Sequence, residues 1–139
     1  MRTTTLLTGL LLVLASYTTS AQQTGKGTVS RLNGAWESDD KKGFTIIHDG
    51  YFNSVGPDSS GNWTNMHAGT LTVNADNTIT FKVLYSSYPS HVGSLNTAEY
   101  SLTGEKLMLH HFKKLIDAEG KDITDQMPKD DRDTMTRLK

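Results

Sequence analysis

The sequence has no cysteine, only three prolines and almost balanced charge. The absence of cysteine among 139 residues excludes a disulfide framework, a thiol nucleophile and a zinc–thiolate site. Fourteen basic and fifteen acidic residues give a net charge of −1 with neutral histidines. This balance does not favour nucleic acid or an anionic membrane surface as a partner, and we expect neither. Because no disulfide can stabilise it, the fold must rest on an apolar core.

Long apolar runs are also absent, except for one at the N-terminus. Residues 6–15 read LLTGLLLVLA after the basic Arg2, and residues 19–21 read Thr-Ser-Ala, as before a cleavage site. This pattern is typical of a secretory signal peptide, and the run is shorter than the roughly 20 residues of a membrane-spanning helix. We expect cleavage after residue 21, no remaining transmembrane segment and a secreted or periplasmic protein; an uncleaved anchor is the alternative. Export without cysteine favours a bacterial source on composition alone.

The rest of the chain is long enough for one domain. Residues 22–31 are polar and rich in glycine, which predicts a flexible lead-in, with a helical turn or simple cap at residues 29–32. Residues 32–139 are expected to form a single folded domain.

Short strand signals fill this domain. Runs rich in Thr, Val, Ile and aromatic residues alternate with turns rich in Gly, Asp and Asn. One turn, Asp49-Gly50, predicts a tight type I′ hairpin, because both of its central positions need positive φ. The expected strands are 35–38, 44–48, 51–55, 62–66 continuing into 68–74, 78–86, 97–103, 106–112 and 134–138.

Two segments predict which side chains face inward. In residues 78–86, strict alternation places four apolar side chains on one face, namely Ile79, Phe81, Val83 and Tyr85. A second hairpin around residues 104–105 places three pairs on one side of the sheet, namely Leu102 with Leu107, Tyr100 with Leu109, and Ala98 with His111. His111 is therefore expected to point inward and His110 outward.

About eight sequential antiparallel strands predict an all-β, up-and-down barrel, because closure removes exposed sheet edges. A barrel of this size is either filled by side chains or holds one small ligand. Residues 113–131 are the least regular part, and we expect a short hairpin near 118–121 and an exposed linker at 127–131.

The opening and closing strands resemble the lipocalin family. Gly34-Ala35-Trp36 on the first strand and Arg137 on the last are similar to the pair that closes one end of a lipocalin barrel. The stretches 69–73, 79–85, 87–93 and 100–107 are similar to bacterial lipocalin-like domains, although a second lipocalin motif with a Thr-Asp-Tyr core is absent. The resemblance implies binding or transport of a small, mainly hydrophobic molecule, and it implies that Gly34, Trp36 and Arg137 form a structural plug. It offers no catalytic residue.

The candidate ligand residues come from the central strands and the neighbouring loops. Tyr85, Tyr100 and His111 each place a polar tip on an apolar face, which suits a cavity wall. Trp63 and Tyr88, with His91, lie near loops and could form a cavity mouth, although the pattern favours ordinary surface aromatics that close over the barrel end. The full set is Phe81, Val83, Tyr85, Tyr88, Tyr100, Leu109, His111 and Trp63.

Catalytic and metal motifs are weak. No nucleophile elbow, phosphate loop or interpretable carboxylate pair is present, so we expect no cofactor. The histidines show no HxH or HxxxH pair, and adjacent strand residues face opposite ways, so we expect no metal site. Two alternatives remain open: a barrel enzyme using His111, such as a lipid isomerase or hydrolase, and a filled barrel that binds a protein or cell-envelope partner.

Overall fold

The computed structural model describes residues 29–127 and 132–139. The predicted signal peptide at 1–21, most of the lead-in at 22–28 and residues 128–131 of the predicted linker lie outside these residues. Residues 29–32 are helical. The strands are β1 (Gly34–Ser38), β2 (Phe44–His48), β3 (Tyr51–Pro57), β4 (Trp63–Val73), β5 (Thr78–Ser86), β6 (Leu95–Thr103), β7 (Lys106–Ile116) and β8 (Asp133–Arg137).

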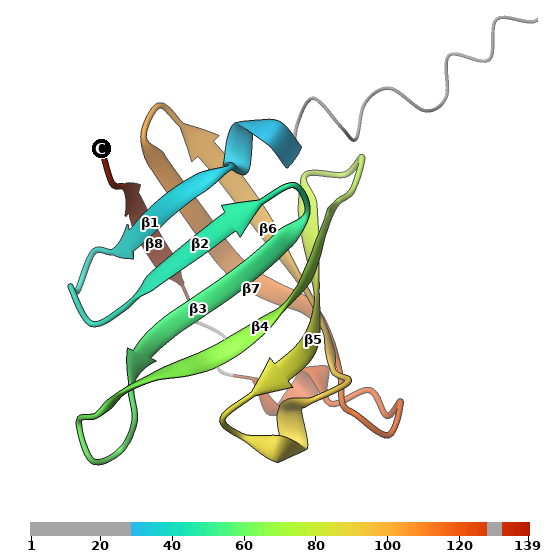
Figure 1. Ribbon diagram of the computed structural model, residues 1–139. Helices are drawn as coiled ribbons and strands as arrows, with labels where there is room; N and C mark the ends of the chain where they lie inside the picture. The colour runs from blue at the N-terminus through green and yellow to red at the C-terminus, as the bar shows by residue number, and fades with distance from the viewer. Residues whose placement is uncertain (1–28, 128–131) are drawn as a thin grey trace, which may run out of the picture.

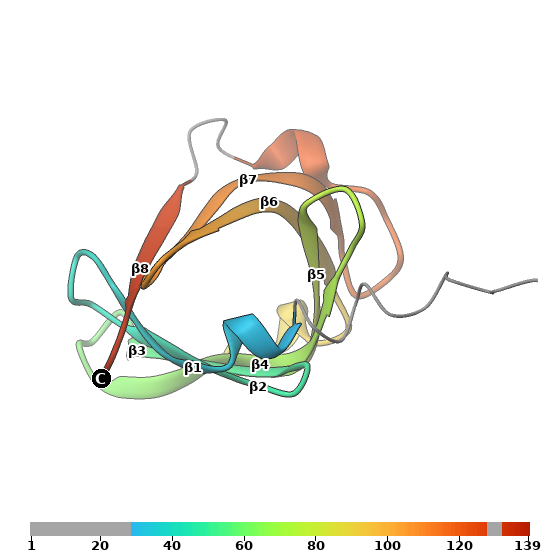
Figure 2. The same cartoon turned by 90° about the horizontal axis from the view of Figure 1, so that it is seen from above.

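The strands form one closed antiparallel barrel in sequential order, with β8 returning to pair with β1 (Figures 1 and 2). The predicted up-and-down architecture is confirmed. Closure rests on a register in which Trp36 lies opposite Arg137 and Ser38 opposite Met135. Since every strand then has two neighbours, the barrel has no free edge.

The β2–β3 hairpin turns at Asp49 and Gly50, as predicted. Asp49 and Gly50 both have positive φ, at 46° and 82°, and the adjacent residues His48 and Tyr51 pair. The predicted reversal near residues 118–121 is also present, closed by a hydrogen bond from Asp117 N to Lys121 O of 2.9 Å. Between the strands lie two 3₁₀ segments, Pro89–His91 and Thr124–Gln126.

A β-bulge interrupts the alternation of β5. Gly69 pairs with Val83 and Ala68 with Tyr85, so Leu84 is an extra residue. A Cβ atom on Gly69 would lie 1.8 Å from the Lys82 carbonyl oxygen, so this close approach requires glycine. The extra residue turns Tyr85 outward, where it is 55% exposed. The predicted inward direction of Tyr85 is therefore wrong.

A similar irregularity reverses His111. Tyr100 pairs with Leu109 as predicted, but Ala98 pairs with Phe112 rather than with His111, because β7 carries an additional residue there. The His111 side chain is 51% exposed and lies 3.8 Å from a carboxylate oxygen of Glu99. The predicted inward direction of His111 is wrong, and Phe112 takes its place.

The two ends of the barrel differ. The helical turn at 29–32 crosses one end of the barrel (Figure 1). The β2–β3, β4–β5 and β6–β7 turns lie at the same end. The β1–β2, β3–β4 and β5–β6 connections lie at the other end. The buried core contains Leu32, Trp36, Ile47, Phe52, Leu71, Ile79, Val83, Leu107 and Met135.

Candidate functional site

Trp36 closes the barrel at the end crossed by the helical turn. Its side chain is fully buried, and its indole N–H donates to the Leu32 carbonyl oxygen at 2.8 Å. A buried indole with a partner for its N–H combines a large apolar contact with a satisfied donor. This arrangement joins the helical turn to β1.

Arg137 covers Trp36 from β8. Its guanidinium carbon lies 4.1 Å from the ring centroid, a cation–π contact. The same group donates to the carbonyl oxygen of Asn33, and to that of Arg31 at 2.7 Å, and pairs with Glu105 at 2.9 Å. A Cβ atom on Gly34 would lie 2.6 Å from the guanidinium, so glycine at this position makes room for Arg137. The three predicted plug residues thus lie in contact.

A cavity of about 710 Å³ occupies the barrel interior beyond this plug. Its volume falls within the range of about 300 to 1,000 Å³ that is common for ligand pockets. The core side chains Ile47, Phe52, Val83, Leu107 and Met135 belong to its lining, so the core continues directly into the cavity wall. Phe81, Leu109 and Phe112 add further apolar surface. This interior suits an apolar molecule.

Uncharged polar side chains interrupt the apolar wall, among them Thr45, Ser54 and Asn96. Thr45 on β2 and Ser54 on β3 share a hydrogen bond of 2.8 Å between their hydroxyl groups. Asn96 on β6 lies on the opposite wall, since β2 and β6 are four strands apart in a closed barrel of eight (Figure 2). The Asn96 Oδ1 atom is buried and has no hydrogen-bond partner within the described residues.

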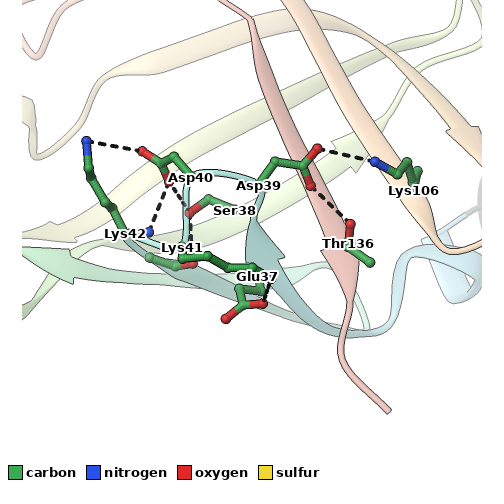
Figure 3. A network of polar contacts seen from close by, with 9 residues as sticks. Glu37, Ser38, Asp39, Asp40, Lys41, Lys42, Lys106 and Thr136 are labelled. Atoms are coloured by element: carbon green, nitrogen blue, oxygen red, sulfur yellow. Dashed lines mark hydrogen bonds and ion pairs between the residues drawn. The ribbon is translucent and has the colours of Figure 1, made fainter.

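Charged residues border the cavity at the β1–β2 turn. Asp39 accepts from Thr136 at 3.0 Å and from Lys106 at 3.3 Å, which lowers the pKa of its carboxyl group (Figure 3). Asp40 accepts from the Ser38 hydroxyl at 2.7 Å and lies 3.8 Å from Lys42. These carboxylates are neutralised locally. The other charged lining residues are Asp133, the first residue of β8, and Arg132, which precedes it.

A histidine pair lies where the β5–β6 connection approaches the cavity. His67 on β4 lines the cavity, and its Nε2 lies 2.9 Å from Nδ1 of His91 in the 3₁₀ segment. Tyr88 lies beside both rings, at centroid distances of 6.3 and 5.4 Å. Burial, with a smaller contribution from His91, lowers the pKa of His67, so its neutral form is favoured. The pair connects the β5–β6 loop to β4.

The predicted ligand residues do not all line this cavity. Phe81, Val83 and Leu109 do. Tyr100 instead packs against the core, where burial raises the pKa of its hydroxyl group. Tyr88 is 40% exposed beside the histidine pair, and Trp63 is 57% exposed and stacks on Phe44, a lining residue.

His110 and His111 belong to another part of the molecule. His110 Nε2 lies 3.1 Å from the Ser101 hydroxyl, and Glu99 pairs with Lys113 at 2.5 Å beside His111. A smaller hollow of about 140 Å³ borders both histidines. Within the described residues, no group of three or more His, Asp or Glu side chains is arranged to hold a metal ion.

Several residues that line the cavity were not predicted from the sequence. Ile47 and Phe52 lie on expected strands whose alternation places them inward, so a face assignment for residues 44–55 would have found them. Phe112 and Asn96 depend on strand register and on the β7 irregularity, for which the sequence carries no glycine or proline signal.

No family model and no curated protein matches this sequence. None of the helical segments in the described part of the chain has the length and apolar character needed to cross a bilayer.

Proposed function

We propose that this protein is an exported, lipocalin-like barrel that binds and carries a small, mainly apolar molecule in its interior. The observation that carries the proposal is the cavity of about 710 Å³ lined by apolar side chains of the core. Burial of an apolar ligand there would gain roughly 25 cal/mol for each Å² removed from water.

The lipocalin assignment within this proposal rests on the closed end. Eight sequential strands, a glycine and a tryptophan on β1, and an arginine of β8 over the indole fit the resemblance noted in the sequence. Many small barrels share the strand order, so Trp36 and Arg137 carry this part of the proposal. The proposed export rests on the signal-peptide pattern at residues 1–21.

The two alternatives receive less support. An enzyme built on His111 would need that side chain in the cavity, but it lies outside the barrel beside Glu99. A filled barrel would need close packing between residues such as Phe81 and Leu109, which instead border the open cavity.

The direct test is native mass spectrometry of the protein purified from its own host. We expect a bound small molecule, identified after denaturation, and a rise in Tm when members of a fatty-acid, alcohol and isoprenoid panel are added. A ligand-free mass together with no thermal shift across the panel would contradict transport.

A matched pair of variants tests whether the ligand binds inside the barrel. Leu109→Trp places a larger side chain at the cavity wall, whereas Leu84→Trp makes the same change at an outer position that is 53% exposed. We expect Leu109→Trp to weaken binding at least tenfold and Leu84→Trp to leave it unchanged. Equal effects would place the ligand outside the barrel.

A further inference from the structure

The rings of His67 and His91 meet end to end. The Nε2 atom of His67 lies 2.9 Å from Nδ1 of His91, the ring centroids are 5.3 Å apart, and the two ring planes differ by 3°. Because the centroids are so much farther apart than the two nitrogens, both rings must extend along the line that joins these nitrogens. The lone pair of one nitrogen therefore faces the N–H of the other, which is the favourable geometry of a hydrogen bond.

This hydrogen bond joins the β5–β6 loop, residues 87–94, to the cavity wall. His67 is half-buried on β4 and lines the cavity. His91 is exposed, as are its neighbours in the loop, which lies at the end of the barrel opposite the helical turn (Figure 1). The end of the loop bonds instead to β5, where the Gly93 N–H donates to the Val83 carbonyl oxygen at 2.8 Å. The histidine pair thus holds the exposed part of the loop to β4.

The hydrogen bond depends on how many protons the two rings carry. In the neutral pair, one of the facing nitrogens carries a proton and the other accepts it. A first additional proton binds an outer nitrogen and leaves this bond intact. A second additional proton puts an N–H on both facing nitrogens, so the bond is lost and two positively charged rings face each other.

The strands and the loop around the pair offer no negative charge to a protonated ring. Strands β3, β4 and β5 and residues 87–94 contain no Asp or Glu. Their other ionisable side chains are Tyr51, Lys82, Tyr85 and Tyr88. The charged residues that line the same cavity come from elsewhere, namely Asp39, Asp40, Lys42, Arg132 and Asp133. Burial without a countercharge on these elements agrees with the lowered pKa of His67.

Protonation of His67 would also oppose a bound apolar molecule directly. An imidazolium on the cavity wall needs water, and a ligand that fills the cavity removes that water. The neutral ring makes no such demand. The ligand is therefore expected to favour the neutral pair, and added protons are expected to favour the empty cavity.

We propose that the His67–His91 pair is an acid-sensitive latch: the neutral pair holds the β5–β6 loop to β4, and its double protonation releases the loop and weakens ligand binding. The inference rests on the proposed function, because it requires that the cavity hold a ligand. It adds a means of regulation, in which the protein binds its ligand at neutral pH and releases it in acidic surroundings. By linkage, release of the ligand is accompanied by proton uptake at the pair.

The first test measures affinity against pH with molecules that do not ionise. A neutral solvatochromic dye is displaced by decanol from the full-length mature protein between pH 7 and pH 5, and circular dichroism checks the fold at each pH. We expect the Kd for decanol to rise about tenfold from pH 7 to pH 5, because protons compete with the ligand. A Kd that does not change with pH while the fold is intact would overturn the latch and leave ligand binding standing.

Two variants assign the pH effect to the pair. His67→Gln keeps a polar side chain that does not titrate, and we expect its Kd for decanol to change less than about twofold over the same range. His110→Gln is the matched control and should keep the wild-type pH dependence, because His110 is also half-buried and hydrogen-bonded but does not line this cavity. An undiminished pH dependence in His67→Gln would overturn the inference.

A measurement on the wild type tests release of the loop without any variant. We expect nitrogen-15 relaxation to give lower backbone order parameters for residues 87–93 at pH 5 than at pH 7, with the strands unchanged. Equal order parameters at the two pH values would contradict the latch. If neither the dye, decanol nor any member of the wider panel binds at any pH, the proposed function fails, and the inference about ligand release fails with it.

Discussion

The two tryptophans of the chain illustrate how different the two ends of the barrel are. Trp36 is fully buried, donates its indole N–H to Leu32 and lies beneath Arg137. Trp63 begins β4 after the β3–β4 connection, is 57% exposed and has one aromatic neighbour, Phe44. The same residue type therefore serves as a plug at one end and as part of a rim at the other.

The polar groups differ in the same way. At the closed end, the carbonyl groups of Arg31, Leu32 and Asn33 accept hydrogen bonds from Trp36 and Arg137. On the cavity wall, Asn96 Oδ1 has no partner within the described residues. The buried polar groups described at the closed end are thus satisfied, whereas the cavity wall contains a buried acceptor that is not.

The largest expected difference is between the two tryptophans. Trp36→Ala removes a buried aromatic side chain and should lower the free energy of unfolding by about 3 to 5 kcal/mol. Trp63→Ala should lower it by less than about 1 kcal/mol, because the exposed ring loses little buried area. Urea unfolding followed by circular dichroism measures both. A loss below about 1 kcal/mol for Trp36→Ala would mean that Trp36 is not the plug.

The next largest effect is expected at Arg137. Arg137→Met removes the cation–π contact and leaves two carbonyl oxygens without their donor, which should cost about 2 kcal/mol in the same unfolding experiment. Arg137→Lys should restore little, because one ammonium group cannot cover the ring and reach both carbonyls. Lys106→Met is the control, since its ion pair with Asp39 is exposed. Full rescue by lysine would show that charge alone matters.

A change of opposite sign is expected at the cavity wall. Asn96→Leu removes an unsatisfied buried group and should raise the free energy of unfolding by about 1 kcal/mol. Thr45→Val, which breaks the bond to Ser54, should lower it by about 1 kcal/mol. Calorimetry of the ligand-free protein distinguishes the two signs. A loss of stability in Asn96→Leu would mean that the amide already has a partner in the free protein.

The smallest effect concerns pH and the histidine pair. The pKa of His67 in the folded protein lies below its ordinary value of 6.5, because burial and His91 disfavour its charged form. The unfolded chain therefore binds more protons as the pH falls below about 7, so His67 should make the folded protein less stable on acidification.

We expect His67→Gln to reduce the loss of stability between pH 7 and pH 5, measured as Tm across that range. His48→Gln is the control, because this side chain is 78% exposed at the β2–β3 turn. An unchanged pH dependence in His67→Gln would contradict the link between acidification and this pair.

Local pattern was sufficient to predict much of the barrel. The alternation in 78–86 predicted the bounds of β5, and Asp49-Gly50 predicted a two-residue hairpin, because each depends on neighbouring residues alone. Within the predicted ligand set, Phe81, Val83 and Leu109 line the cavity, because alternation holds at these positions.

The incorrect directions arose where alternation is interrupted. Gly69 inside an expected strand was an available sign of the bulge that turns Tyr85 outward, because glycine in a strand often marks a close backbone approach. For His111 no comparable sign exists, since the segments 95–103 and 106–116 contain neither glycine nor proline. The direction of the His111 side chain depends instead on how many residues each of the two strands has between paired positions.

By itself, the sequence determined the class of the fold, the order of its strands and the residues suited to closing one end, since these follow from local periodicity and turn chemistry. Only the tertiary structure decided that His111 lies outside, that Phe112 replaces it and that Asn96 lines a cavity without a partner. The reason is physical: a side chain's direction in a closed barrel depends on register across strands, and a bulge contributed by one strand reverses the directions that local alternation predicts.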